Sequence, residues 1–332
     1  LSDYFAPFDL DGDLDTSNNY ESFRSNVYPA VSYYNVIETE THYIIQYIFY
    51  YPSYFNGSNY FEHDIAATQV LVTKEAEPKL LIAESGNNGR PYFGFATSGN
   101  NISARGQGRL AKSFPESSLW EGSHYRAYHG RNLHRPCHWE WAPDTAELLI
   151  APECNHSEGQ FLDGSEDKSI VYYPGTTGQV WIATNCSNQD MCDASVGIAC
   201  QDGTCRDSDG EQAATYELRS FLSELWVRRV SLDGSSNVFG LQSSYAPHED
   251  SGDRPGREEN FRFPGSFATA DSMSRGRLPF TWDSDGSVSR GQWWVDPAYT
   301  LSTRFNLGDD FSLDYCFNPY LDIDRRGEQG CE

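Results

Sequence analysis

Alternating aspartates near the start of the chain have the clearest capacity for chemistry. They are Asp9, Asp11, Asp13 and Asp15. Alternate carboxylates in a loop can converge on one point, and a hard cation such as Ca²⁺ takes about six to eight oxygen ligands. The spacing matches the first four alternating ligands of a calcium loop, although the glycine stands fourth rather than sixth and Tyr20 is the twelfth residue. Because four such carboxylates repel one another without a cation, the segment predicts a Ca²⁺ site, with a solvated acidic turn as the alternative.

Two further groups of residues offer weaker chemistry. Asp283 and Asp285 precede a glycine and form a second cation candidate. Imidazoles gathered near a carboxylate can bind zinc or transfer protons near neutral pH, which makes a metal-dependent hydrolase the alternative function. The residues available for it are His63, Asp64, His124, His129 and His134. Strand alternation would place His124 and His129 on opposite faces, so we expect most of these histidines to be structural.

The eight cysteines predict disulfides and an oxidising compartment. Four of them run C-x5-C-x7-C-x4-C without a CxxC pair, which is not a zinc spacing. We expect these four to bond among themselves, with Cys137 bonded to Cys154 and Cys316 to Cys331. The four clustered residues are Cys186, Cys192, Cys200 and Cys205.

Charge and composition narrow the range of partners. The formal net charge of −24 disfavours nucleic acid and anionic membrane surfaces. No run of about 18 apolar residues occurs, so we expect no membrane span. The first residue is Leu1 rather than Met, which we interpret as a mature N-terminus left after a signal peptide was removed. Together with the cysteines, these features predict a secreted protein. Four sequons are candidates for glycosylation, at Asn56, Asn101, Asn155 and Asn185.

The elements that must position these residues begin with three consecutive strands. Residues 31–38, 42–51 and 64–74 are rich in Tyr, Ile, Val and Phe, which favour a pleated and packed surface. Residues 44–51 are apolar on both faces apart from Gln46, so we expect this strand in the middle of a sheet with material packed over each side. Residues 39–41 are short enough to close a hairpin between the first two strands.

The rest of the chain predicts mainly β structure with long loops. We expect one notable helix at 211–229, because a capping-box pattern precedes apolar residues at helical spacing. The fold class predicted is an antiparallel β-sandwich, jelly-roll-like, formed by a single domain over residues 1–332 with an Asp-rich N-terminal loop and a loop-rich C-terminal extension. The remaining expected hairpins pair 79–84 with 90–96 and 168–173 with 179–184.

Several short motifs resemble a group of secreted β-sandwich proteins. The motifs are an aromatic strand at 47–52, the segment 62–66, residues 123–125 leading to His134, and the stretch 293–299. They are similar to the necrosis-inducing and vacuolar-protein-sorting-62-like proteins, above all to uncharacterised bacterial members. The resemblance covers about half of the chain and implies a secreted β-sandwich.

The resemblance also implies a divalent-cation element that helps to engage glycosylated lipid headgroups. That element is His-x-x-Asp-x-Glu, and Asp64 takes its Asp position. Phe61 and Ala66 take the His and Glu positions, so two of the three ligands are replaced. His63, Asp64 and His134 are therefore interpreted as a degraded form of the element, which counts against inherited chemistry.

These observations favour a calcium-stabilised, non-enzymatic extracellular protein that acts by contact. Its partners would be glycans or copies of itself in a homo-oligomer or filament. Tyr-rich edge strands could pair between copies. Exposed aromatic rings could stack on sugars, the candidates being Trp120, Trp139, Trp141, Trp293 and Trp294.

Overall fold

The structure of the protein is a computed structural model. It describes residues 6–7, 30–55, 60–84, 93–105, 109–110, 120–121, 124–125, 127–129, 136–138, 171–174, 186–187, 189, 192, 194–206, 208, 213–224, 226–228, 230–232, 260–262, 296–321 and 323–331.

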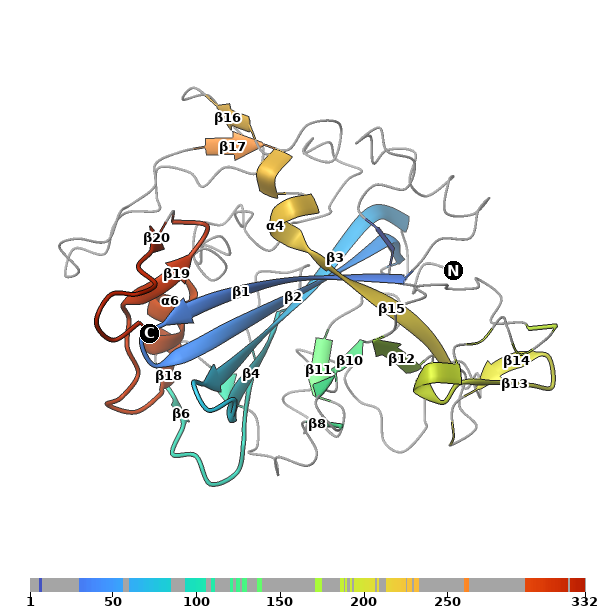
Figure 1. Cartoon of the computed structure of the whole chain (residues 1–332), viewed down its shortest axis with the longest axis horizontal. Coiled ribbons are helices and arrows are strands. Elements are labelled where there is room, and N and C mark those ends of the chain that lie inside the picture. Colours follow the sequence, from blue (N-terminus) through green and yellow to red (C-terminus); the bar gives the residue numbers. More distant parts are fainter. Residues whose placement is uncertain are drawn as a thin grey trace.

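An antiparallel meander of five strands forms the centre of the main sheet (Figure 1). The strands are β1 (Ala30–Thr39), β2 (His42–Phe55), β3 (Tyr60–Thr73), β4 (Pro78–Glu84) and β5 (Phe93–Ala96). They follow one another in space as in sequence, which keeps every connection short. The three predicted strands are confirmed as β1, β2 and β3, and the predicted hairpin of 79–84 with 90–96 is confirmed as β4 and β5. Strands β2 and β3 extend further toward each other than expected.

Shorter strands extend the sheet on both sides. Strand β15 (Ala213–Ser220) runs parallel to the first half of β1, and β12 (Val171–Pro174) runs parallel to β15. On the opposite edge, β7 (Arg109–Leu110) pairs with β5 in parallel. The C-terminal strand β19 (Tyr315–Asn318) pairs antiparallel with the end of β1, and β20 (Ile323–Asp324) pairs with β19. The protein is therefore mainly β, with a largely antiparallel sheet that has parallel additions.

Among the described residues, five two-stranded sheets accompany the main sheet. They are β6 (Ser103–Ala104) with β18 (Phe305–Asn306), β8 (Trp120–Glu121) with β9 (His124–Tyr125), β10 (Ala127–His129) with β11 (Pro136–His138), β13 (Ala199–Gln201) with β14 (Thr204–Arg206), and β16 (Val230–Leu232) with β17 (Asn260–Arg262). The predicted strand at 168–173 is present in part as β12, but its partner is β15; residues 179–184 lie outside the described residues.

The main core lies on one face of the sheet, called here the inner face. Alternate residues of the central strands are fully buried there, including Ile37, Ile44 and Ile48. They pack against Phe221 and Trp226 of the segment after β15 and against the C-terminal segment. The opposite, outer face is only partly covered along β1 and β2, where burial alternates residue by residue. The expectation that residues 44–51 lie in the middle of a sheet is confirmed, and the cover expected over each side is more complete on the inner face than on the outer face.

The predicted helix at 211–229 is also wrong. Residues 213–220 form β15, and only a single turn of helix, α4 (Phe221–Glu224), and a 3-10 turn, η5 (Trp226–Arg228), follow. Leu218, expected on the apolar side of the helix, is 46% exposed. The backbone of β15 pairs with both β1 and β12, and this pairing outweighs a weak helical preference.

A helix that we did not predict precedes the C-terminal strands. It is α6 (Pro297–Arg304), with Pro at its first position and Asp296 at the N-cap position. Proline suits this position because the first helical N–H groups have no partner within the helix. Ala298 and Leu301 are fully buried and belong to the inner-face core. Phe305 directly after the helix packs on Gly94 so closely that a Cβ there would lie 2.6 Å from the ring.

Three disulfides are formed among the described residues, between Cys186 and Cys200, Cys192 and Cys205, and Cys316 and Cys331. The cluster bonds within itself and the last pair joins β19 to the C-terminal end, as the sequence indicated. Cys154 lies outside the described residues, so its predicted bond to Cys137 is not described. Figure 1 shows the β13–β14 hairpin, which carries two of the bonds, at the far end of the molecule from the C-terminal strands.

The N-terminus of α6 depends on one tyrosine hydroxyl. The Tyr315 hydroxyl donates to Asp296 Oδ1 at 2.5 Å and accepts the Ala298 N–H at 3.0 Å. Both contacts are buried, and Tyr315 is 3% exposed. The hydroxyl thus joins β19 to the first turn of α6.

We predict that Tyr315→Phe lowers the free energy of unfolding by about 1–3 kcal/mol, because it removes both buried hydrogen bonds and leaves the ring in place. Urea unfolding of the full chain measures this change. The control is Tyr34→Phe, which alters a more exposed hydroxyl and should stay within about 0.5 kcal/mol of the parent. Equal stability of the Tyr315 variant and the parent would contradict the assignment.

Candidate functional site

The outer face of β1, β2 and β15 carries a group of partly exposed aromatic and aliphatic side chains. Residues that pair directly across neighbouring strands point to the same face of a sheet. Tyr34 of β1 pairs with Tyr47 of β2, and Ser32 of β1 pairs with Leu218 of β15. Tyr34 is 36% exposed. This surface is called here the tyrosine face and consists of Tyr34, Val36, Tyr43, Ile45, Tyr47, Phe49, Tyr216 and Leu218.

The strands that carry the tyrosine face lie inside the sheet. Strand β2 pairs with β1 on one side and β3 on the other. The second edge of β1 is shared by β15 and β19. The expected pairing of Tyr-rich edge strands between copies is therefore not available to β1 and β2, and a partner can reach their tyrosines only through the side chains.

Two phenols of the tyrosine face, those of Tyr47 and Tyr216, have raised pKa values. Burial raises the pKa of Tyr47 above its ordinary value. Burial, together with the neighbouring Tyr47, raises the pKa of Tyr216 to about 12. A phenol with a raised pKa stays protonated at physiological pH, so each hydroxyl can both donate and accept a hydrogen bond. The face therefore offers aromatic ring surface and neutral hydroxyl groups, and the phenols of Tyr47 and Tyr216 would not act as bases.

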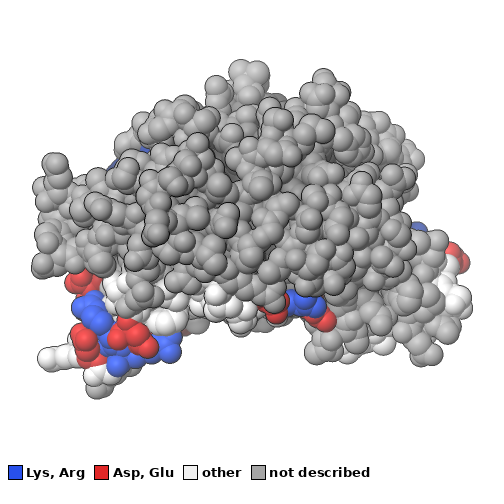
Figure 2. All heavy atoms as spheres, turned by 90° about the horizontal axis from the view of Figure 1, so that it is seen from above, with Lys and Arg blue, Asp and Glu red and all other residues white. Residues whose placement is uncertain are grey.

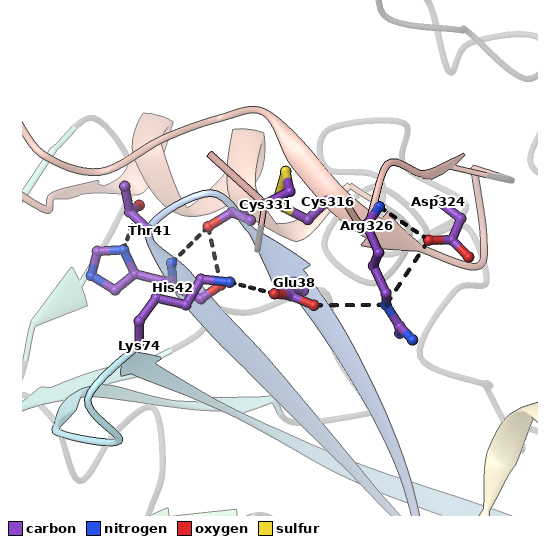
Figure 3. Close-up of polar contacts among 9 residues, drawn as sticks. Glu38, Thr41, His42, Lys74, Cys316, Asp324, Arg326 and Cys331 are labelled. Carbon is purple, nitrogen blue, oxygen red and sulfur yellow. Dashed lines mark hydrogen bonds and ion pairs between the residues drawn. A yellow bond between two sulfur atoms is a disulfide. The ribbon is translucent and has the colours of Figure 1, made fainter. Parts of the chain in front are cut away.

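Paired charges border one end of the tyrosine face (Figure 3). Glu38 of β1 lies opposite Tyr43 of β2 and binds Lys74 at 2.5 Å. The Lys74 ammonium also lies 4.3 Å from the centroid of the Tyr43 ring. Arg326 approaches Glu38 at 3.9 Å and stacks on Phe317 at 4.2 Å. Lys74 and Glu38 are mostly buried, whereas Arg326 is 57% exposed. The ion pair between Glu38 and Lys74 therefore contributes more to stability than the one between Glu38 and Arg326.

The described charges do not form a patch of one sign on the side of the molecule in Figure 2. Acidic and basic side chains are intermixed at one end, beside neutral described residues.

A histidine lies at the other end of the tyrosine face. The Tyr51 hydroxyl and His129 Nδ1 are 2.7 Å apart, and the His129 ring meets Phe49 edge-on at 4.4 Å. Strand β10, which carries His129, pairs with β11, so this small hairpin approaches the outer face of the main sheet. Asp64 is the backbone partner of Tyr51 on β3. Asp64 is therefore the register partner of the tyrosine whose hydroxyl contacts His129, and the side chain of Asp64 itself is not described.

For the other predicted site residues the structure gives at most a backbone position. His63 lies beside Asp64 on β3 and His124 lies on β9, but their side chains are not described. The remaining candidates lie outside the described residues, namely His134, the aspartates at 9, 11, 13 and 15, Asp283 and Asp285. Of the predicted tryptophans, Trp120 lies on β8 with its side chain not described, and Trp139, Trp141, Trp293 and Trp294 lie outside as well.

Among the described residues, one group of potential metal ligands converges. The sulfur atoms of Cys186, Cys192 and Cys205 lie within 4.8 Å of one another. These three residues belong to two neighbouring disulfides, and metal ligation requires a thiolate. The convergence is therefore a consequence of the disulfides.

The tyrosine face was not predicted from the sequence. The signal was the alternation of Tyr43, Ile45, Tyr47 and Phe49 along β2, which places all four on one side of the strand. We expected material packed over both sides of this strand, because its residues are apolar on both faces apart from Gln46. Only burial in the folded chain distinguishes the two sides.

His42 joins the β1–β2 hairpin to the C-terminal segment. Its side chain is 5% exposed, its Nδ1 lies 2.8 Å from Thr41 Oγ1, and its ring lies 5.2 Å from that of Phe311. Thr41 Oγ1 also accepts the Ser312 N–H at 3.0 Å. Burial lowers the pKa of His42, although the nearby carboxylate of Asp310 opposes this shift.

Comparisons of the chain with protein-family models, curated proteins and solved structures find no match. The described residues contain no helix that is long and apolar enough to cross a membrane. The resemblance to secreted β-sandwich proteins therefore stays a prediction.

We predict that His42 makes the protein less stable as the pH falls from about 7 to 5. The unfolded chain binds a proton at His42 near pH 6.5, before the folded chain does, so acid favours unfolding. Urea unfolding across this range should show a weaker pH dependence for His42→Gln than for the parent, because the other histidines contribute equally to both. Identical pH dependences would contradict the role of His42.

Proposed function

We propose that this protein is secreted and acts by contact, binding glycans through the tyrosine face. The observation that carries the proposal is a group of partly exposed tyrosines on strands whose backbone edges are already paired. Three disulfides suit an oxidising exterior and support the proposed compartment.

The chemistry of the face matches that of a sugar. A hexose presents C–H groups on its ring faces and hydroxyls around its rim. Aromatic rings supply a flat apolar surface for the former, and phenol hydroxyls exchange hydrogen bonds with the latter. Tyr43 and Tyr47 are separated by about 13 Å along β2, which leaves room for more than one sugar ring. Lys74 and Glu38 at the end of the row provide further polar groups.

Self-association through the same face is the second candidate. Leu218 is an aliphatic side chain, 46% exposed, beside the tyrosines. An aliphatic group contributes to a protein–protein contact through area alone. In this case two copies would meet face to face, since β1 and β2 have no free edge, and a homo-oligomer rather than an edge-paired filament would result.

We also propose that the fold is a jelly-roll-like sandwich, and a cation-dependent activity is the alternative function. The approach of the β10–β11 hairpin to the outer face supports a second layer over the sheet. A metal-dependent hydrolase or lectin-like toxin would use the region of His63 and Asp64. Loss of a measured turnover in Asp64→Ala or His63→Ala protein would favour that alternative over binding.

We predict that Tyr34→Ala weakens glycan binding roughly tenfold, or about 1.4 kcal/mol, by removing an exposed ring from the face. A glycan array identifies the ligand, and calorimetry on the full chain compares the variants. Val227→Ala is the control, because Val227 is 63% exposed on η5 and lies outside the face.

Three outcomes distinguish the candidates. Weaker binding by the Tyr34 variant and unchanged binding by the Val227 variant support the proposal. A protein that binds no glycan but forms a dimer disrupted by Tyr34→Ala supports self-association. A monomer that binds no glycan contradicts both.

We also propose that Ca²⁺ stabilises the protein through Asp9, Asp11, Asp13 and Asp15. A ligand that binds only the folded state raises the melting temperature. We therefore expect a chelator to lower the melting temperature and added Ca²⁺ to restore it. Replacing Asp11 and Asp13 with Asn should abolish this response, whereas the same change at Asp283 and Asp285 tests the weaker candidate. A melting temperature unaffected by the chelator would mean that the aspartates form a solvated turn.

A further inference from the structure

We propose that Asn101 carries an N-linked glycan. Asn101, Ile102 and Ser103 form an Asn-x-Ser acceptor, and the other three acceptors of the chain lie outside the described residues. This inference rests on the proposed function in one respect only, namely that the protein is secreted, because glycosylation requires passage through a secretory pathway.

Alternating burial directs the acceptor toward solvent. Asn101 and Ser103 are exposed, whereas Ile102 between them packs against the inner-face core. The apolar contact of Ile102 holds the segment in place, and its two polar neighbours point away from that contact. A bulky oligosaccharide on Asn101 would therefore displace no core residue.

The chain on both sides of the acceptor is fixed. Before it, the Asn100 N–H donates to the Thr97 carbonyl at 3.2 Å and closes a turn in which Gly99 has a positive φ of 93°. After it, Ser103 pairs with Asn306 in the β6–β18 sheet. The Arg105 N–H also donates to the Arg304 carbonyl at 2.7 Å. The acceptor is thus a short exposed segment held at both ends, so a glycan would have a defined position.

The glycan would leave the tyrosine face open. Ile102 packs into the cluster that fills the inner face, whereas Tyr34 and Leu218 lie on the outer face. Glycosylation at Asn101 should therefore shield the segment that joins β5 to β6 without covering the surface that we assign to binding.

The reaction is a glycosyl transfer from a lipid-linked oligosaccharide. The Asn101 side-chain nitrogen forms a bond to the anomeric carbon, while the bond from that carbon to the diphosphate oxygen breaks. The lipid diphosphate leaves, and the amide nitrogen loses one proton. The Ser103 hydroxyl completes the acceptor, so removing it should prevent the transfer even though Asn101 remains.

The test uses the full chain secreted from a eukaryotic cell that performs N-glycosylation. Peptide mass spectrometry after enzymatic deglycosylation in heavy-oxygen water reports the occupancy of Asn101. We expect most of the secreted protein to be occupied, and Asn101→Gln and Ser103→Ala to abolish the modification. Ser103→Thr is the matched control, because it preserves the acceptor and should preserve occupancy.

The outcomes separate this inference from the proposed function. Secreted parent protein with an unmodified Asn101 peptide overturns it, and so does equal occupancy in the parent and Ser103→Ala. Protein that is retained in the cell and unmodified also overturns it, through the shared requirement for secretion. Glycan-array binding that is unchanged in Asn101→Gln supports the separation of the two surfaces, whereas stronger binding overturns it.

Discussion

Backbone pairing of β2 on both of its edges is the constraint on which the rest of the structure depends. Because β3 pairs with nearly all of β2 and β1 pairs with its residues 43–49, the N–H and C=O groups of β2 are satisfied from both sides over that stretch. Its side chains must then alternate strictly between two faces. Ile44 and Ile48 enter the inner core, and Tyr43 and Tyr47 fall on the opposite side. The residues of the core and those of the proposed binding surface thus lie on opposite faces of the same strands.

The C-terminal segment covers the inner face and secures the end of the β1–β2 hairpin. Tyr315 bonds to the first turn of α6, Phe311 packs on His42, and the Cys316–Cys331 disulfide closes the segment on itself. Residues far apart in the chain therefore contribute to one end of the sheet. This arrangement explains why the protein keeps a paired charge cluster there, since Glu38 meets Lys74 from β3's end and Arg326 from the C-terminal segment.

The sequence pattern predicted the structure correctly where contacts between residues close in the chain determined it. The β-branched and aromatic runs of β1, β2 and β3 predicted strands because their backbones could pair with neighbours close in sequence. The even count and close spacing of four cysteines predicted that the 186–205 cluster bonds within itself, whereas the structure decided which of them pair. In α6 the Asp-Pro start was present in the sequence and could have been recognised.

The sequence by itself determined the β character of the chain, its central hairpins and the fact that the cysteine cluster bonds within itself. Only the tertiary structure decided that residues 213–220 are a strand, because their partners β1 and β12 lie far away in the chain. It also decided which side of β2 is covered. Two apolar faces of a strand are indistinguishable in sequence, and Tyr47 differs from Ile48 only through what the fold packs over each. Burial is a property of the whole chain, so the candidate binding surface could not be predicted from β2 alone.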